Sequence, residues 1–143
     1  MRVLLGANIL VSYLLTPSGD SSVVRVVEAG VLGAYTLLLP EGLLEELEEA
    51  ASAKPYLAGR IARDDLLALR EVLEAIAETI PAIRGPIPEI TRDRSDDYLL
   101  AYAVVGAADY LVTGDHDILV LERVDEVRII TPREMVRLLV EDA

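Results

Sequence analysis

The sequence predicts an α/β fold in which a parallel sheet is covered by helices on both faces. Short apolar runs rich in Leu, Val and Ile recur along the chain, and such runs are typical of strands buried on both faces. Longer segments with helical spacing separate them, and this alternation favours parallel strands joined by helical crossovers. The length of 143 residues indicates a single domain over residues 1–143.

Five strands are expected. The clearest lies at 109–113, because Tyr110 to Thr113 are aromatic, aliphatic or β-branched and Gly114 then ends the run. The residues Gly85-Pro86-Ile87-Pro88 predict a rigid, extended stretch before the fourth strand. The five expected strands cover residues 2–5, 34–39, 80–83, 109–113 and 127–130.

Helices are expected between these strands, and residues at their ends carry start signals. Asn8 can cap the first helix, Pro40 suits the first position of the helix after the second strand, and Ser95 can cap the helix before the fourth. Thr131 and Glu134 have the spacing of a capping box. The expected helices cover residues 9–15, 20–29, 40–53, 54–61, 64–78, 95–108, 118–121 and 132–140.

The composition excludes several classes of protein. The net charge of −12 lacks the basic footprint of a simple DNA-binding module, although an enzyme that holds phosphates through cations stays compatible with it. Cysteine is absent, which excludes disulfides and thiolate metal sites. The apolar runs are too short to span a bilayer, and the amino terminus has no clear secretory pattern, so we expect a cytoplasmic protein that does not enter a membrane.

Carboxylates follow the fourth strand and begin the helix before it. Asp115 and Asp117 come directly after Gly114, where the loops of an open α/β sheet converge and bind ligands. Two carboxylates there suggest a site for a hard cation, or simply an Asp- and Gly-rich turn. Asp96 and Asp97 lie in the first turn of their helix, where the helix dipole alone would favour them by about 0.3–1 kcal/mol.

The helix at 40–53 offers two more candidate carboxylates. Glu46 and Glu48 lie at the two edges of its apolar arc, and a side chain at such an edge can turn toward a cleft. The alternative is a solvated acidic flank.

Four stretches together resemble the PIN-domain family, and the resemblance covers essentially the whole chain. Within the family, the chain is similar to small prokaryotic proteins regarded as toxins of toxin–antitoxin pairs. The most specific stretch is Ala108-Asp109-Tyr110-Leu111-Val112-Thr113-Gly114-Asp115, and the four matching stretches cover residues 3–12, 43–47, 93–103 and 108–115.

The resemblance implies a three-layer α/β/α sandwich with a parallel sheet of order 3-2-1-4-5 and a crevice between strands 1 and 4. It further implies a ribonuclease that depends on Mg²⁺ or Mn²⁺, with RNA as substrate, an antitoxin as possible partner, and a homodimer through the first two helices. Family positions are matched by the acids Glu46, Asp97 and Asp115, by Asp117 as an accessory acid, and by Asn8 in the first motif.

Carboxylates suit this chemistry, because Mg²⁺ takes oxygen ligands and uses one or two carboxylates with water and phosphate. A bound cation acidifies a water and neutralises charge on a phosphodiester. The chain departs from the family at the first motif, where Gly6 and Ala7 stand in place of Asp and Thr. Gly6 removes a principal ligand, so the chain is either a natural member with weakened or lost activity or one altered to abolish it. The alternative function is a catalytically degenerate module that binds RNA or protein.

Several other residues have two interpretations each. Thr113 could contact a phosphate or merely end the strand. His116 could contact a phosphate or lie in a solvated turn. Arg84, Arg92 and Arg94 could guide RNA phosphates toward the cleft, or be solvated loop charges.

Other enzyme classes find little support. A phosphoacceptor receiver domain needs a Lys near the last strand, and the only Lys is Lys54. No P-loop sequence and no nucleophile-elbow motif occurs in the chain.

Overall fold

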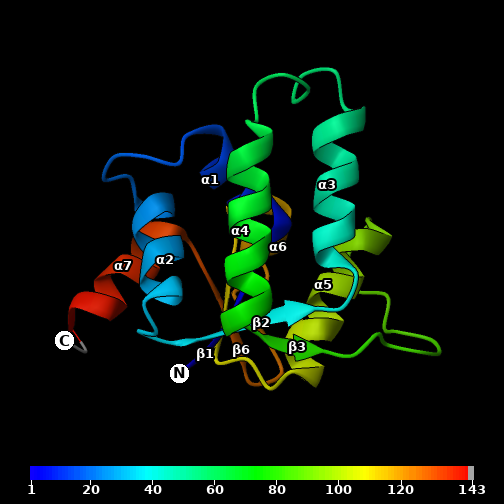
Figure 1. Ribbon diagram of the computed structural model, residues 1–143. Helices are drawn as coiled ribbons and strands as arrows, with labels where there is room; N and C mark the ends of the chain where they lie inside the picture. The colour runs from blue at the N-terminus through cyan, green and yellow to red at the C-terminus, as the bar shows by residue number, and fades with distance from the viewer. Residues whose placement is uncertain (142–143) are drawn as a thin grey trace.

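The computed structural model describes residues 1–141. A six-stranded sheet forms its centre, in the order β3-β2-β1-β4-β6-β5, with helices packed around it (Figure 1). The five longer strands pair in parallel, which confirms the predicted α/β class and the order predicted for five strands. The strands are β1 (Arg2–Leu5), β2 (Thr36–Pro40), β3 (Glu78–Ile80), β4 (Tyr110–Val112), β5 (Arg123–Val124) and β6 (Val127–Ile130).

The sixth strand corrects the prediction of about five. β5 consists of two residues and pairs antiparallel with β6 at the edge of the sheet. Two residues are too few to form an apolar run or an alternating pattern, so the sequence does not predict this strand.

Helices cover both faces of the sheet. Val3 and Leu5 of β1 belong to one core cluster, shared with α1, α2, α3, α4 and α7. Leu4 points to the opposite face and belongs to a second cluster with α5 and α6. The result is a three-layer α/β/α arrangement. The helices are α1 (Ala7–Leu15), α2 (Ser22–Val31), α3 (Leu43–Ala53), α4 (Arg63–Ile76), α5 (Arg94–Val105), α6 (His116–Leu119) and α7 (Pro132–Glu141).

Two element boundaries around α3 differ from the prediction. Pro40 ends β2 opposite Ile80 instead of opening a helix, because the fixed φ of proline also suits the end of a strand. Gly42 then adopts a left-handed conformation, with φ of 88°, and α3 begins at the next residue. Residues 54–61 form turns and not the expected helix.

Three further boundaries move by a few residues. β3 lies at Glu78–Ile80 instead of 80–83, since α4 already ends at Ile76. α5 begins at Arg94, because Asp93 and not Ser95 is the N-cap, and the Asp93 carboxylate accepts a hydrogen bond from the Ser95 backbone N–H at 2.8 Å. α6 starts two residues before the predicted helical turn.

The capping box at the start of α7 is confirmed. The Thr131 hydroxyl accepts a hydrogen bond from the Glu134 backbone N–H at 3.1 Å, and the Glu134 carboxylate accepts one from the Thr131 N–H at 3.2 Å. Among residues 1–141, no helix combines the length and the apolar character needed to cross a membrane.

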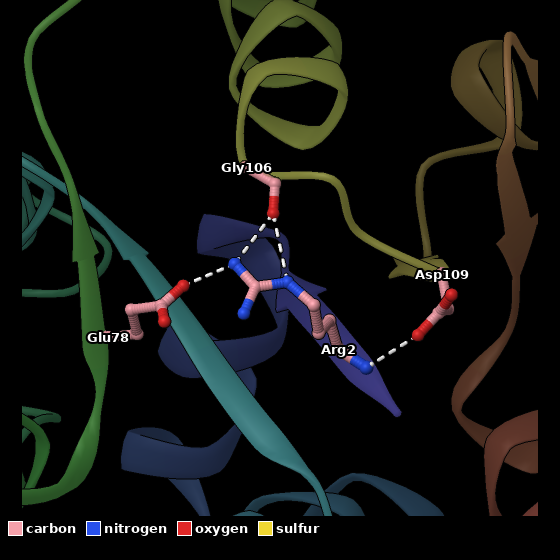
Figure 2. A network of polar contacts seen from close by, with 4 residues as sticks. All are labelled: Arg2, Glu78, Gly106 and Asp109. Atoms are coloured by element: carbon pink, nitrogen blue, oxygen red, sulfur yellow. Dashed lines mark hydrogen bonds and ion pairs between the residues drawn. The ribbon is translucent and has the colours of Figure 1, made fainter.

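A network around Arg2 fixes the amino end of the sheet (Figure 2). The guanidinium pairs with Glu78 on β3 and donates to the backbone carbonyl of Gly106 after α5 at 2.8 Å and 3.1 Å. The Arg2 backbone N–H donates to the Asp109 carboxylate at 2.8 Å. This polar cluster joins β1, β3 and the residue before β4 at the edge away from the strands' carboxyl ends, so we assign it a structural role.

Candidate functional site

One pocket of about 420 Å³ opens at the carboxyl ends of β1, β2 and β4. Ligands of open α/β sheets bind at such an edge. The pocket mixes carboxylates with hydroxyl, amide and aromatic groups. Its polar and aromatic lining consists of Asn8, Glu41, Glu46, Ser95, Asp96, Tyr98, Tyr102, Thr113 and Asp115.

A second groove, of about 330 Å³, lies among α1, α2 and α4. Its floor is apolar, and Glu28 and Asp65 are its two carboxylates. None of the residues singled out from the sequence lines it, so the pocket at the strand ends is the stronger candidate for chemistry.

The turn after β4 places Asp115 in the pocket wall. Thr113 is 1% exposed, and its hydroxyl accepts a hydrogen bond from the Asp115 backbone N–H at 3.1 Å. The Asp115 carboxylate caps α6 by accepting from the Asp117 N–H at 3.0 Å. Asp117 and His116 are exposed and do not line the pocket. The strand end therefore presents one carboxylate, Asp115, to the pocket and directs the next two residues to solvent.

The two acids at the start of α5 lie in different surroundings. Asp96 lines the pocket, and burial followed by repulsion from Asp115 raises the pKa of its carboxyl from 3.8 to about 6. Asp97 is 3% exposed and is not part of the pocket lining. Its Oδ1 accepts hydrogen bonds from the N–H groups of Ile90 and Thr91 and from the Thr91 hydroxyl, and the bonds from Thr91 lead in lowering its pKa.

The two glutamates predicted on α3 separate in the same way. Glu46 lines the pocket from the side of β2. Glu48 instead pairs with Arg70 of α4 at 2.8 Å, an ion pair that joins the neighbouring helices α3 and α4 (Figure 1). Glu46 therefore lies on the pocket wall, whereas Glu48 lies in a helix–helix contact.

The first motif brings Asn8 into the position left open by Gly6. The Gly6 N–H donates to the Val112 carbonyl at 2.9 Å, so this turn lies directly beside the end of β4. A Cβ atom added to Gly6 would lie 2.8 Å from Asn8 Oδ1, and one added to Gly114 would lie 3.5 Å from Asn8 Nδ2. The Asn8 carboxamide thus fills the space between the two glycines. Gly6 has φ of −62° and ψ of 152°, which any residue adopts.

Three arginines predicted to guide phosphates lie outside the pocket lining. Arg84, Arg92 and Arg94 are exposed. Arg94 is the one with a link to the pocket, because its guanidinium carbon lies 5.4 Å from the ring centroid of Tyr98.

Three further residues line the pocket although no sequence pattern predicted them there: Glu41, Tyr98 and Tyr102. The Glu41 carboxylate accepts a hydrogen bond from the Ala82 backbone N–H at 2.8 Å, and the Tyr102 hydroxyl accepts one from the Ile83 backbone N–H at 3.3 Å. Both contacts involve the segment between β3 and α5, a tertiary neighbour that no local sequence pattern reveals.

The donor set can be compared with what a divalent cation requires. Over residues 1–141, no three His, Cys, Asp or Glu side chains gather closely enough to hold one ion. Mg²⁺, however, keeps several waters and usually takes only one or two carboxylates from a protein. The carboxylates on the pocket fit such a partly hydrated cation, and they do not form an all-protein cage.

Comparison with known families agrees with the fold. The model of the PIN-domain family matches residues 2–117, and the chain therefore belongs to this family. The search of curated proteins returned no match. Membership establishes a nuclease-type fold.

Proposed function

We propose that the chain is a PIN-domain nuclease of the divalent-cation-dependent type, acting on RNA phosphodiesters, with activity weakened at the first motif. The observation that carries the proposal is the convergence of Glu46, Asp96 and Asp115 on one pocket. These acids come from α3, the start of α5 and the turn after β4, so the fold, and not local sequence, brings them together.

The electrostatics of the pocket support a cation there. Asp96 carries a raised pKa because burial and its acidic neighbours, Asp115 first among them, disfavour its ionised form. A divalent cation would relieve both effects at once. Asp115 and Asp96 are the groups on the pocket wall that would hold Mg²⁺ or Mn²⁺, with Glu46 on the part of the wall formed by α3 and Asp117 as an outer acid, whereas Asp97, which the resemblance predicted as a ligand, lies outside the pocket lining.

A cation bound there would acidify a water and offset the negative charge that develops on a phosphodiester. The chain's own residues would supply orientation. The buried Thr113 hydroxyl holds the Asp115 backbone, and Tyr98 with Arg94 offers an aromatic and cationic surface beside the pocket on which a base could stack. Arg92 and Arg84 would contribute positive charge to an otherwise acidic chain.

Gly6 is the reason for proposing weakened activity. The resemblance expects a carboxylate there, and the neutral Asn8 carboxamide now fills that space. One negative charge fewer lowers the attraction for a divalent cation, and water must replace the missing ligand. A toxin role with an antitoxin partner and a homodimer through α1 and α2 stay predictions from the resemblance, and a cytoplasmic location stays a prediction from the sequence.

A second candidate is a degenerate PIN fold that binds RNA or protein without cleaving it. It is favoured by the same Gly6 and by the lack, within the described chain, of three metal-binding side chains around one point.

RNA cleavage by the chain and by Gly6→Asp separates the two candidates. Both proteins are incubated with structured and single-stranded RNA in Mn²⁺, Mg²⁺ or EDTA, and Asp115→Asn in the Gly6→Asp background is the control. We expect little cleavage by the chain, clear EDTA-sensitive cleavage by Gly6→Asp, and its loss in the double variant. Absence of cleavage by every form would favour the binding module.

A further inference from the structure

The neighbouring carboxylates Asp96 and Asp97 begin the same helix but meet different parts of the molecule. We infer that Asp96 is the carboxylate that faces a bound cation in the pocket, and that Asp97 is a positioning residue that clamps the segment 81–93 against α5. This assignment gives Asp96 the cation-binding role that the family resemblance gives to Asp97. The role of Asp96 rests on the proposed function, whereas the role of Asp97 does not.

The contacts of Asp97 fit a structural clamp. One of its oxygens accepts three hydrogen bonds, from the Thr91 N–H at 2.8 Å, the Thr91 hydroxyl at 2.9 Å and the Ile90 N–H at 3.1 Å. Asp97 is 3% exposed and does not line the pocket, so a cation that sits in the pocket and keeps most of its water would not meet it there. Both backbone donors would be left without this partner if the carboxylate turned toward the pocket.

The clamped segment itself borders the pocket. It leaves β3 at Ile80 and passes through Gly85, whose φ is 95°, and Ile87, which is 8% exposed. Two residues of the pocket lining bind it near its start, because Glu41 accepts from the Ala82 N–H and Tyr102 from the Ile83 N–H. Asp97 binds its far end. The segment is therefore fastened at both ends, and its placement is coupled to the pocket wall.

Asp96 has the contacts expected of a ligand position. It lines the pocket together with Asp115, and no hydrogen bond within residues 1–141 engages its carboxylate. Its acidic neighbours there come from two different elements, since Asp115 lies after β4 and Asp93 precedes α5. The geometry thus leaves Asp96 available to a cation and Asp97 committed to the segment.

Matched variants test this division. Asp96→Asn and Asp97→Asn remove one charge each at adjacent positions, and Asp97→Ala also removes the acceptor. Mn²⁺ affinity is measured from the free-ion signal in electron paramagnetic resonance, and hydrogen exchange is followed at the amides of Ile90 and Thr91.

We expect Asp96→Asn to weaken Mn²⁺ binding about tenfold, with unchanged exchange at Ile90 and Thr91. Asp97→Ala should speed exchange at both amides about tenfold or more, and Asp97→Asn, which keeps an oxygen acceptor, should restore much of the protection. Mn²⁺ affinity of Asp97→Asn should stay within about threefold of the parent chain.

Opposite results would overturn the inference. If Asp97→Asn loses Mn²⁺ affinity and Asp96→Asn does not, the roles are reversed while the proposed cation site stands. If the parent chain and its Gly6→Asp variant both fail to bind Mn²⁺, the proposed function and the role of Asp96 fail together. Unchanged exchange at Ile90 and Thr91 in Asp97→Ala would refute the clamp in either case.

Discussion

Replacing Asp96 by Asn should stabilise the protein at neutral pH. The carboxylate is forced into a pocket where burial and the charge of Asp115 disfavour ionisation, and its pKa rises from 3.8 to about 6. At pH 7 the folded protein must nevertheless carry this charge. The isosteric amide removes the repulsion and keeps the shape of the side chain.

The magnitude follows from the two pKa values. Each pKa unit between the folded and unfolded states is worth about 1.4 kcal/mol, so the change from 3.8 to about 6 corresponds to about 3 kcal/mol at most. Asp96 is only partly buried, and solvent screens its neighbours. We therefore expect Asp96→Asn to raise the free energy of unfolding by about 1–2 kcal/mol at pH 7.5.

The sign of the pH dependence is fixed by which state holds the proton. Between pH 4 and 6 the folded protein keeps a proton on Asp96 that the unfolded chain has already released. This group therefore lowers stability progressively as the pH rises through that range, and above it the loss is complete. The advantage of Asp96→Asn should appear over the same interval and vanish below about pH 4.

Urea unfolding at several pH values between 4 and 7.5 measures this difference. Asp64→Asn is the matched control, because Asp64 occupies the first turn of α4 and lies outside the pocket at the strand ends. The change in the free energy of unfolding caused by Asp64→Asn reports the helix-dipole contribution of a first-turn carboxylate alone, which is about 0.3–1 kcal/mol. If Asp96→Asn is less stable than the parent at pH 7.5 after the helix-dipole contribution is subtracted, the ionised Asp96 carboxylate does not destabilise the folded protein. A gain that persists unchanged at pH 4 would show that it does not come from ionisation of Asp96.

Two further predictions concern the scaffold. Gly30→Ala should lower the free energy of unfolding by about 1–3 kcal/mol, because the new Cβ would lie 2.6 Å from the hydroxyl oxygen of Tyr35. That hydroxyl is held in place by the hydrogen bond that it donates to the Val26 carbonyl. An unchanged thermal unfolding temperature would contradict this packing. Thr131→Ala should cost about 1 kcal/mol, since the Glu134 N–H loses its acceptor in the capping box, and an equal melting temperature would show that the cap contributes nothing.

Part of this architecture can be predicted because its cause is local. The buried runs at β1, β4 and β6 are continuous in the sequence, and Thr131 and Glu134 carry the capping signal within four residues. The placement of Asp115 follows from the same logic, because a strand of a parallel sheet delivers the next residues to its carboxyl edge.

Other features depend on partners outside the helix or strand that carries the residue. Adjacent residues of a helix point about 100° apart, so Asp96 and Asp97 meet different surroundings. The backbone of Ile90 and Thr91 holds the Asp97 carboxylate away from the pocket, and nothing in the helix pattern reveals this. The Arg2 network likewise cannot be predicted from a local pattern, because its partner Glu78 lies on another strand.

Gly6 is the position on which the proposed cation site depends most directly, and Mn²⁺ titration of three proteins tests its role. These are the parent chain, Gly6→Asp, and Gly6→Asn as an uncharged control of equal size. The extended backbone at Gly6 accepts either side chain once the Asn8 carboxamide turns aside, so both variants should fold. We predict that Gly6→Asp binds Mn²⁺ about tenfold more tightly than the parent, whereas Gly6→Asn does not. Equal affinities of Gly6→Asp and Gly6→Asn would contradict a cation site at this pocket that lacks its first carboxylate.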